Sequence, residues 1–554
     1  MSRPKILLSP AIGRWRHELE ALLGVSGVPM WMPARLASID RVICSAAPGD
    51  IRRAARMAER AKVPLTVLGR GPVGPLEPTR SADACPLSFW RLDLGAGAPL
   101  PDHPRRAAIE AALGNADAAR GEKLLALWQD GGFSGDAPDG LPEAIRTDLD
   151  PVPSETVFAD AVLAGSLLYR DPYDGGALDP EEALDLYAFL RQRIRENDRR
   201  AFCVGVKWWN HKGVAALLAG PTGPAVFTDD FDAALARAKD ESGRLIAWSA
   251  SATPEREAAC AAAGVPFSRM EDGFLRSVGL GAALARGASA AFDATGIYFD
   301  ATRPSDLETL LETRELTDAE IARGRHLKEA VVAARLTKYN VGRRAAENVF
   351  PKDHPGILVP GQVADDAGIL KTLSTTVDCS GASNVNESLL KAARARNPDA
   401  FIVYKPHPDV EADLRKGKVP EDVARRYADA IVRDVDILDL IDGCDRIETV
   451  SSLAGFEALM RGKAVTVHGM PFYAGWGLTE DLASTPRRTR KRSIDELVFC
   501  AMIAYCRYID PETMLHCRPE RLIGNLSRLR ADRRHHLRYA AIKFVSWFGR
   551  KIGL

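Results

Sequence analysis

Short apolar runs rich in β-branched residues alternate along this chain with longer stretches whose apolar positions recur at helical spacing. Residues 41–44 and 64–68 are of the first kind, and the Ala-rich residues 51–62 between them are of the second. Continuous apolar runs are typical of strands that are buried on both faces, and their alternation with helices is typical of βαβ units. The pattern therefore predicts an α/β fold built on parallel sheets.

The same pattern divides the chain into regions. Its 554 residues exceed one usual domain, and Gly, Pro, Asp and Ala dominate residues 97–153. We expect an N-terminal α/β region over 1–153 that ends in a linker, Rossmann-like domains over 154–350 and 351–510, and a tail over 511–554. The strands expected in the two domains are 201–206, 244–248, 296–300, 356–360, 400–404, 446–450 and 464–468.

Residues 45–71 faintly resemble residues 251–273. Both begin with a Ser-Ala-x-Pro helix start and end with a Val-Pro strand that leads to a glycine. The first copy has Arg70 where the second has Asp272. One pair of segments leaves open whether the chain contains a duplication or a chance likeness.

Composition excludes several classes of protein. Lys and Arg together number 74, as do Asp and Glu, so the average surface gives no reason to expect a nucleic-acid partner. The nine cysteines contain no C-x-x-C pair, which is typical of reduced core thiols. The first ten residues lack the layout of a secretory signal, and no run approaches ~18 apolar residues. We therefore expect a cytoplasmic protein.

Two neighbouring acids follow a predicted strand. Glu271 and Asp272 come after the strand-like residues 266–270, so they are expected at the carboxyl end of a strand, where α/β folds bind ligands. Adjacent residues of an extended segment point to opposite sides. We expect Asp272 to face a cleft and Glu271 to brace the loop. Read alone, an acidic turn before Gly273 is more often an ordinary loop.

A second candidate follows the strand at 401–404. Lys405, His407 and Pro408 form a proline-stiffened turn, and two cations held with little freedom suit a phosphate. The alternative is a turn with solvated charges.

A third candidate is the helix start after the strand at 446–450. Ser451 and Ser452 precede the helical residues 453–459, whose free N–H groups and dipole attract a phosphate, and Glu457 can accept hydrogen bonds from ribose hydroxyls. A simple N-cap is the alternative.

A loop with Gly361 and Gln362 follows the strand at 356–360. Its acids Asp365 and Asp366 lack a matching set of ligands for a metal, so we interpret them as helix-start residues.

Three further segments have two interpretations each. Residues 472–479 hold three aromatic residues among glycines, and they either stack on a base or sugar ring or form a buried turn. Residues 533–551 combine cations with large apolar residues and resemble an interfacial helix on an anionic membrane, with the basic run 487–492 as a second contact. A solvated tail that packs its aromatic residues on the protein is the alternative.

Taken in order, these segments resemble the capsule-polysaccharide β-Kdo transferases of the KpsC type. The resemblance covers residues 168–508. The segments that carry it are 271–281, 296–304, 361–366, 404–409, 451–458 and 471–477.

The resemblance implies a GT-B-like α/β fold, in which two Rossmann-type domains flank a cleft behind the N-terminal α/β region. It also implies transfer of Kdo from CMP-Kdo to a lipid-linked acceptor of the phosphatidylglycerol type, with retention of anomeric configuration. Implied partners are CMP-Kdo, the lipid-linked Kdo acceptor, the anionic inner-membrane surface and other capsule biosynthesis and export proteins. The protein would lie in the cytoplasm, on the inner face of the inner membrane.

The resemblance also implies roles for particular residues. Asp272 would be the nucleophile of a double displacement, with Glu271 and His407 as the other catalytic residues. Arg276 would bind the carboxylate of the sugar. The nucleotide sugar would be held, without a metal or other cofactor, by Gly361, Gln362, Lys405, His407, Pro408, Ser451, Ser452 and Glu457.

The sequence departs from the family pattern in two ways. The members that we compare it with carry two complete transferase modules, whereas this chain has one intact module behind a shortened N-terminal region that looks non-catalytic. The chain also has Ala-Trp-Ser-Ala at residues 247–250, where we would expect a Trp-Gly stretch that includes a basic residue. Transfer of another CMP-linked ulosonic acid, a non-catalytic assembly subunit, and a GT-B-fold epimerase or hydrolase remain alternatives.

Overall fold

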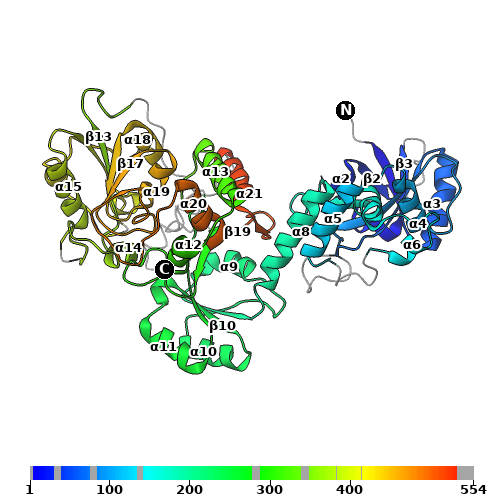
Figure 1. Ribbon diagram of the computed structural model, residues 1–554, viewed down its shortest axis with the longest axis horizontal. Coiled ribbons are helices and arrows are strands. Elements are labelled where there is room, and N and C mark those ends of the chain that lie inside the picture. Colours follow the sequence, from blue (N-terminus) through cyan, green and yellow to red (C-terminus); the bar gives the residue numbers. More distant parts are fainter. Residues whose placement is uncertain are drawn as a thin grey trace. The chain divides into compact units, whose positions relative to one another are not determined.

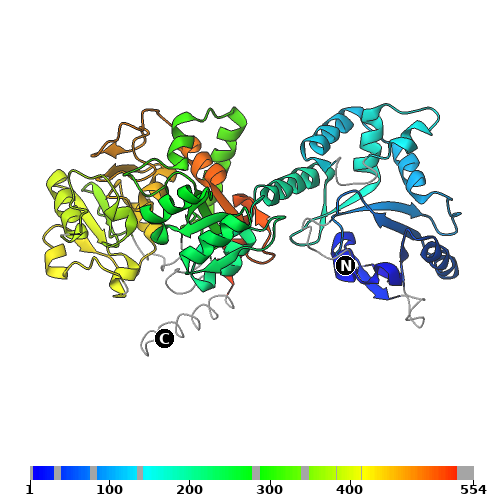
Figure 2. The same cartoon turned by 90° about the horizontal axis from the view of Figure 1, so that it is seen from below.

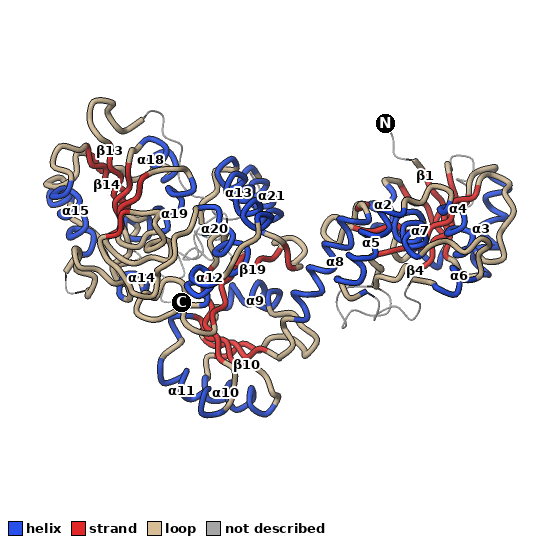
Figure 3. Tube along the Cα trace, viewed as in Figure 1, coloured by secondary structure: helices blue, strands red, loops and turns tan. Residues whose placement is uncertain are grey.

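The computed structural model describes residues 4–29, 39–74, 84–133, 141–277, 287–338, 348–381, 383–413 and 415–532. The chain forms two compact units, Met1–Asp198 and Arg199–Leu554 (Figure 1). Figure 3 shows three separate groups of strands, one in the first unit and two in the second. The predicted α/β class is therefore confirmed.

The first unit holds a seven-stranded sheet of order β2-β1-β3-β4-β5-β6-β7. The pairs among β1 to β4 are parallel, and β5, β6 and β7 continue the sheet in antiparallel pairs. Its strands are β1 (Lys5–Leu8), β2 (Ser26–Pro29), β3 (Arg41–Ser45), β4 (Leu65–Arg70), β5 (Ser88–Leu94), β6 (Leu167–Arg170) and β7 (Ala177–Leu178). Its helices are α1 (Pro10–Gly13), α2 (Arg16–Leu23), α3 (Pro48–Ala61), α4 (Pro104–Leu113), α5 (Ala118–Asp130), α6 (Glu143–Thr147), α7 (Glu155–Asp160), the π-helix η3 (Ala161–Gly165) and α8 (Pro180–Arg195).

The boundary expected at residue 153 is wrong, because the first compact unit extends to Asp198. Strand β6 pairs with β5, and the hydroxyl of Tyr187 in α8 donates to the carbonyl oxygen of Leu87 at 2.9 Å. The Gly- and Pro-rich residues suggested a linker, but they lie at the ends of helices α4 and α5. Ile109 of α4 and Trp128 of α5 are buried in the core of this unit. Turn residues thus mark the ends of elements here and not a domain boundary.

The first lobe of the second unit is a seven-stranded sheet of order β20-β19-β12-β11-β10-β8-β9. Its strands are β8 (Ala201–Val204), β9 (Val226–Thr228), β10 (Arg244–Trp248), β11 (Phe267–Asp272), β12 (Ser289–Asp293), β19 (Cys506–Ile509) and β20 (His516–Cys517). Its helices are the 3-10 helix η4 (Trp208–Asn210), α9 (His211–Leu217), α10 (Phe231–Asp240), the 3-10 helix η5 (Ser249–Ser251), α11 (Pro254–Ala263), α12 (Asp306–Thr313), α13 (Asp318–Ala333), α20 (Ile494–Val498), the π-helix η7 (Phe499–Tyr505) and α21 (Pro519–Ala531).

Two expectations for this lobe are wrong. Residues 296–300 form a turn and not a strand, because the carboxylate of Asp293 accepts hydrogen bonds from the backbone N–H groups of Thr295 and Gly296 and ends β12 there. The boundary at residue 510 also fails, since β19 pairs with β12 and returns the chain to this first sheet.

The second lobe is a six-stranded parallel sheet of order β15-β14-β13-β16-β17-β18. This lobe is drawn in yellow-green to orange in Figure 2. Its strands are β13 (Gly356–Pro360), β14 (Phe401–Lys405), β15 (Ala430–Ile431), β16 (Arg446–Thr449), β17 (Ala464–Val467) and β18 (Glu480–Asp481). Its helices are α14 (Ala367–Leu370), α15 (Val385–Arg396), α16 (Pro408–Glu411), α17 (Glu421–Ala424), α18 (Ile437–Gly443) and α19 (Leu453–Met460). Two α/β lobes in one compact unit give the GT-B-like fold that was expected.

The two units repeat one architecture. Strands β1 to β7 of the first unit occur in the same sheet order as β8 to β12, β19 and β20 of the second. A π-helix precedes the sixth strand of each sheet in chain order, and the tyrosine hydroxyl of that strand donates to a carbonyl oxygen six residues earlier, from Tyr169 to Leu163 and from Tyr508 to Met502. The structure therefore confirms the internal repeat.

The repeat extends to the end of the fourth strand in each sheet. Gly71 and Gly273 directly follow β4 and β11, and a Cβ on either would lie within 2.5 Å of a serine Oγ on the next strand. Arg70 ends β4 where Asp272 ends β11. In the first unit, residues 131–154 connect α5 to α7. At the corresponding place of the second unit, between α13 and α20, residues 334–493 hold the whole second lobe. The described part of the first unit is thus a first lobe without a second.

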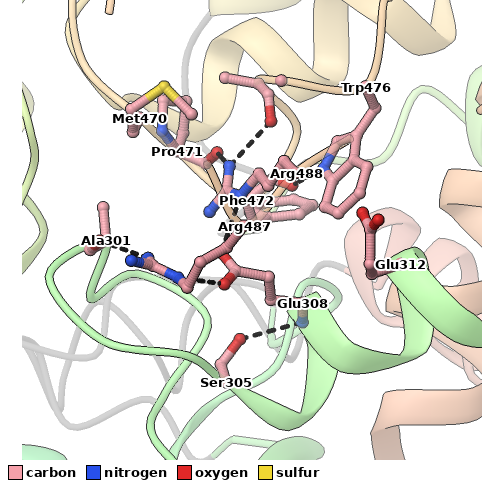
Figure 4. Close-up of polar contacts among 12 residues, drawn as sticks. Ala301, Ser305, Glu308, Glu312, Met470, Pro471, Phe472, Trp476, Arg487 and Arg488 are labelled. Atoms are coloured by element: carbon pink, nitrogen blue, oxygen red, sulfur yellow. Dashed lines mark hydrogen bonds and ion pairs between the residues drawn. The ribbon is translucent and has the colours of Figure 1, made fainter. Parts of the chain in front are cut away.

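Basic residues of the returning segment fasten the second lobe to the first (Figure 4). Glu308 of α12 accepts from Arg487 Nε at 2.6 Å and from Arg488 Nε at 2.8 Å. Arg488 also donates to the carbonyl oxygens of Pro471 and Ala474 at 2.6 and 2.8 Å. The side chain of Arg488 is nearly buried, so this residue cannot belong to the second membrane contact expected at 487–492. For the exposed residues of that run the contact stays a prediction.

We predict that Glu308→Ala lowers the free energy of unfolding by about 3–5 kcal/mol, because it leaves the nearly buried guanidinium of Arg488 without its carboxylate. Chemical denaturation measures the effect. The control is Glu315→Ala, which removes the carboxylate that pairs with Arg490 from an exposed position, and it should change stability little. Equal effects of the two substitutions would contradict this role of Glu308.

Candidate active site

The last residues of β11 are Glu271 and Asp272, as predicted from the sequence. Asp272 Oδ2 accepts from Arg276 Nε at 2.7 Å, and the Tyr298 hydroxyl donates to the Asp272 carbonyl oxygen at 3.3 Å. A Cβ on Gly287 would lie 3.3 Å from Asp272 Oδ1. The carboxylate is thus oriented through Oδ2, with a glycine beside Oδ1.

Glu271 braces the neighbouring loops. One of its carboxylate oxygens accepts from the Ser249 hydroxyl, which follows β10, and the other accepts from the Asp272 N–H at 3.1 Å. Burial, and next to it the charge of Asp272, raises the pKa of Glu271 to about 7. The bracing role expected for this residue agrees with these contacts.

Arg276 is almost fully buried and donates to both Asp272 and Ser277. In this structure it positions the Asp272 carboxylate. Its assignment to the carboxylate of a sugar stays a prediction.

Strand β14 ends at Lys405, and His407 caps the short helix α16, in which Pro408 is the first residue. His407 Nδ1 accepts from the Asp409 N–H at 3.2 Å, and burial lowers the pKa of this imidazole. Near neutral pH, His407 is therefore neutral, with its proton on Nε2 as a directed donor. The expected pair of cations is in this respect wrong.

Lys405 points to a neighbouring loop. Its Nζ donates to the carbonyl oxygen of Arg433 at 2.8 Å, and burial lowers its pKa. In this structure Lys405 holds the loop at Arg433, and a direct contact with phosphate stays a prediction.

Gly361 and Gln362 connect the end of β13 to the ends of β14 and β16. A Cβ on Gly361 would lie 2.9 Å from the backbone nitrogen of His407, so the close approach of these two loops requires glycine. Gln362 Oε1 accepts from the Ser451 N–H at 2.9 Å. Its buried Nε2 has no hydrogen-bond partner among the residues that the structure describes. An unpaired buried donor among three strand ends is a position where a bound anion or carbonyl group would fit.

Ser451 and Ser452 open α19. Ser452 Oγ accepts from the Ala454 N–H at 3.3 Å, which confirms the predicted N-cap. Ser451 Oγ donates to the carbonyl oxygen of Gly368 at 3.0 Å. Both serines lie at the carboxyl edge of the second sheet, beside Gln362.

Glu457 lies deeper in α19 and is enclosed. Its carboxylate accepts a hydrogen bond at 3.3 Å from the backbone N–H of Lys338, which belongs to the first lobe. Burial raises the pKa of Glu457 to about 7. A contact with ribose stays a prediction.

An aromatic cluster joins the two lobes. The ring of Phe274, two residues after Asp272, lies 4.6 Å from Phe472 and 6.0 Å from Phe456 of α19. Phe472, Tyr473 and Trp476 are nearly or fully buried. Of the two interpretations of residues 472–479, the buried turn is therefore confirmed for these three residues, and their rings do not form an open stacking surface. The cluster places the end of β11 close to the start of α19.

The structure assembles the candidate residues in two groups, one on each lobe. Gly361, Gln362, His407 and Ser451 share one edge of the second sheet, and Asp272 ends β11 in the first. Among the described residues no hydrogen bond or ion pair joins Asp272 to His407. Between the groups, Asp300 pairs with Lys371 at 3.1 Å and so links the first lobe to α14.

Sequence reasoning missed two residues that support these groups. Asn386 exchanges hydrogen bonds with the backbone of Gln362, at 2.8 and 2.7 Å, and thereby fixes its loop. Ser249 supports Glu271. The available signal for Asn386 was its helical spacing from Leu390 and Ala393, which places a polar residue on the buried face of α15.

The acids near β13 behave largely as expected. Asp366 caps α14 through the N–H of Gly368 at 3.0 Å, and Asp365 pairs with Arg415 at 3.2 Å.

In the described ranges no three His, Cys, Asp or Glu side chains gather as a metal would require. Nor does any described helix combine the length and apolar character needed to cross a bilayer. The basic residues 533–551 lie outside the described residues.

Comparison with known proteins finds a matching family and several relatives of this chain. Residues 244–509 match the model of a family described as capsule polysaccharide biosynthesis protein. The chain is 38% identical over 364 residues to the capsule polysaccharide modification protein LipA of Neisseria meningitidis serogroup A, which covers 64% of this chain and 49% of LipA. It is 46% identical over 248 residues to the lipopolysaccharide-processing protein LpsZ of Rhizobium meliloti, over 44% of this chain and 54% of LpsZ. The chain thus spans about half the length of these curated relatives.

Among solved structures, the chain is similar to one titled Thermosulfurimonas dismutans KpsC, beta Kdo 2,4 transferase. The two share 31% sequence identity with a TM-score of 0.51, over 59% of this chain and 98% of that one. The residues matched by the family model include Asp272, His407 and Ser451.

We predict that stability depends on pH through Glu271. Its pKa of about 7 lies above the ordinary 4.5, so its contribution to stability is complete below about pH 4.5 and is lost as the pH rises through 7. Glu271→Gln removes this loss. The melting temperature of the variant, relative to the parent, should rise by roughly 2 °C or more between pH 5 and pH 8.

Differential scanning fluorimetry across this pH range is the measurement. Glu315→Gln is the control, because Arg490 lowers the pKa of Glu315 and this exposed acid should show no such rise. A Glu271→Gln difference that stays constant with pH would refute the raised pKa.

Proposed function

Because this chain belongs to the capsule polysaccharide biosynthesis protein family, we propose that it is a retaining β-Kdo transferase. The donor is CMP-Kdo, and the acceptor is a lipid-linked capsule precursor of the phosphatidylglycerol type. The observation that carries the proposal is the meeting of three strand ends of the second lobe at Gln362, His407 and Ser451, with the carboxylate of Asp272 at a strand end of the first.

The donor phosphate lies at the edge of the second sheet. Gln362 Nε2 is a buried donor without a partner among the described residues, because the contact of this side chain with Ser451 runs through Oε1. His407 Nδ1 accepts from the Asp409 N–H, which leaves Nε2 as the donor of this imidazole. Directed donors stabilise the charge that grows on a departing CMP. The start of α19 at Ser452 adds the positive end of a helix dipole.

Asp272 is the nucleophile. Its Oδ1 attacks the anomeric carbon of Kdo, the bond from this carbon to the phosphate oxygen breaks, and CMP leaves with the electron pair. Arg276 holds Oδ2 at 2.7 Å and so fixes the attacking direction. The acceptor hydroxyl then displaces Asp272 and loses its proton, and the two inversions together retain the anomeric configuration.

Glu271 is the second acid of the site. A carboxyl group with a pKa of about 7 can accept a proton near neutral pH. Its contacts with Ser249 and with the Asp272 backbone also keep the strand end in position.

The complete pair of lobes occurs once among the described residues, so we propose that one site in the second unit performs the transfer. The first unit ends its corresponding strand in Arg70, which cannot act as a nucleophile. The reaction takes place at the cytoplasmic face of the inner membrane, where the acceptor lipid lies and where other capsule biosynthesis and export proteins are partners.

We predict that the purified chain releases CMP from CMP-Kdo in the presence of a synthetic Kdo-lipid acceptor. Asp272→Asn should lower this rate at least about 10³-fold, since the nucleophile is lost, and His407→Ala about 10²–10³-fold, since a donor to the leaving phosphate is lost. Release of CMP measures the rate, and mass spectrometry with NMR identifies the product and its stereochemistry.

Arg70→Ala is the matched control, because it changes the equivalent strand end of the first unit, and it should keep the parent rate. Full turnover by Asp272→Asn would refute the assignment of the nucleophile. Transfer from another CMP-linked ulosonic acid but not from CMP-Kdo would change the donor, and failure to bind any cytidine nucleotide would favour a non-catalytic subunit.

A further inference from the structure

Trp208 is the most exposed large apolar side chain in the described part of the chain. It has 70% of its surface open to solvent, against 36–53% for Leu100, Val152 and Leu370, the other large apolar side chains that are exposed there. Single exposed apolar residues are common on proteins. What distinguishes Trp208 is its place in the fold.

Trp208 follows the carboxyl end of β8, two strands from β11 in the sheet. Gly205 turns the chain there with φ of 76°, and a Cβ on it would lie 2.1 Å from Ser251 Oγ. Ser249 in the same short helix as Ser251 supports Glu271. The loops that follow β8, β10 and β11 therefore abut one another along one edge of the sheet.

The segment that carries Trp208 is also anchored beside Asp272. Asn210 is buried, and its Oδ1 accepts from the Gly287 N–H at 3.5 Å. Gly287 is the residue whose Cβ would lie 3.3 Å from Asp272 Oδ1. The exposed indole of Trp208 thus lies only two positions before Asn210, the anchor that flanks the carboxylate.

The surroundings of this indole fit an acidic sugar. The ring of Trp209 meets that of Trp208 edge-on at 5.9 Å, and Lys207 and Lys212 on either side are exposed. The C–H face of a pyranose buries apolar surface on an indole, and a lysine ammonium pairs with a sugar carboxylate.

We propose that Trp208, with Lys207 and Lys212, forms the acceptor subsite, which holds an anionic sugar of the acceptor on the first lobe. The proposal deepens the proposed function and rests on it for the identity of the reaction. An indole with two lysines would also suit a membrane surface, but the anchoring of Asn210 beside Asp272 favours a sugar that must reach the reacting carboxylate.

The test compares the parent chain with Trp208→Ala and Trp208→Phe. Trp208→Ala should raise the KM for a water-soluble Kdo glycoside acceptor about tenfold or more, with kcat and the KM for CMP-Kdo nearly unchanged. Trp208→Phe, which keeps an aromatic face, should restore most of the affinity. Val152→Ala is the control for loss of an exposed apolar side chain and should change nothing.

Binding of the same glycoside, measured by saturation-transfer NMR without any donor, separates this inference from the proposed function. If the glycoside binds in a Trp208-dependent way but the chain does not use CMP-Kdo, the proposed function is refuted and the subsite is supported. An unchanged KM and unchanged glycoside binding in Trp208→Ala would overturn the subsite. The subsite would also be overturned if Trp208→Ala lost only its co-sedimentation with phosphatidylglycerol vesicles, because that result would show a membrane contact instead.

Discussion

The packing of Phe274 against Phe456 and Phe472 is the contact on which the rest of this site depends. Phe274 belongs to the loop that follows Asp272, Phe456 to the helix that Ser452 caps, and Phe472 to the buried turn of the second lobe. Aromatic rings at 4.6–6.0 Å bury a large apolar surface between the lobes. A reaction shared between two lobes needs such a constraint, because a misplacement of about 1 Å can slow a reaction 10²-fold.

The arginines that bind Glu308 form a second connection between the two lobes. Arg488 reaches both α12 of the first lobe and the carbonyl oxygens of the loop that carries Phe472. The chain then returns through α20 and η7 to add β19 to the first sheet. The second lobe is therefore tied to the first through its returning segment as well as through the aromatic cluster.

The internal repeat shows what the first unit lacks. Its sheet repeats the strand order, the π-helix and the tyrosine contact of the first lobe of the second unit. The described residues hold only one sheet with the character of the second lobe, and the strand that corresponds to β11 ends in Arg70. The core of such a sheet depends on apolar packing and not on the residue at the strand end, so one architecture can carry different residues there.

The sequence predicted those features that are local. The ends of β11 and β14, the cap at Ser452 and the alternation of strands and helices follow from residue types at short spacing. The failures involve partners far along the chain. Nothing near residues 472–476 shows that they meet Phe274, nothing near Arg488 shows Glu308, and the pairing of β6 with β5 moved the expected boundary from 153 to 198. Burial likewise turned His407 from an expected cation into a neutral donor.

A crystal structure of the full chain with CMP is the most direct test of the proposal that an acid on one lobe faces a phosphate site on the other. We expect the phosphate within hydrogen-bonding distance of His407 Nε2 and Gln362 Nε2, on the side of the second sheet that faces Asp272. CMP bound at any other edge, or in the first unit, would contradict it.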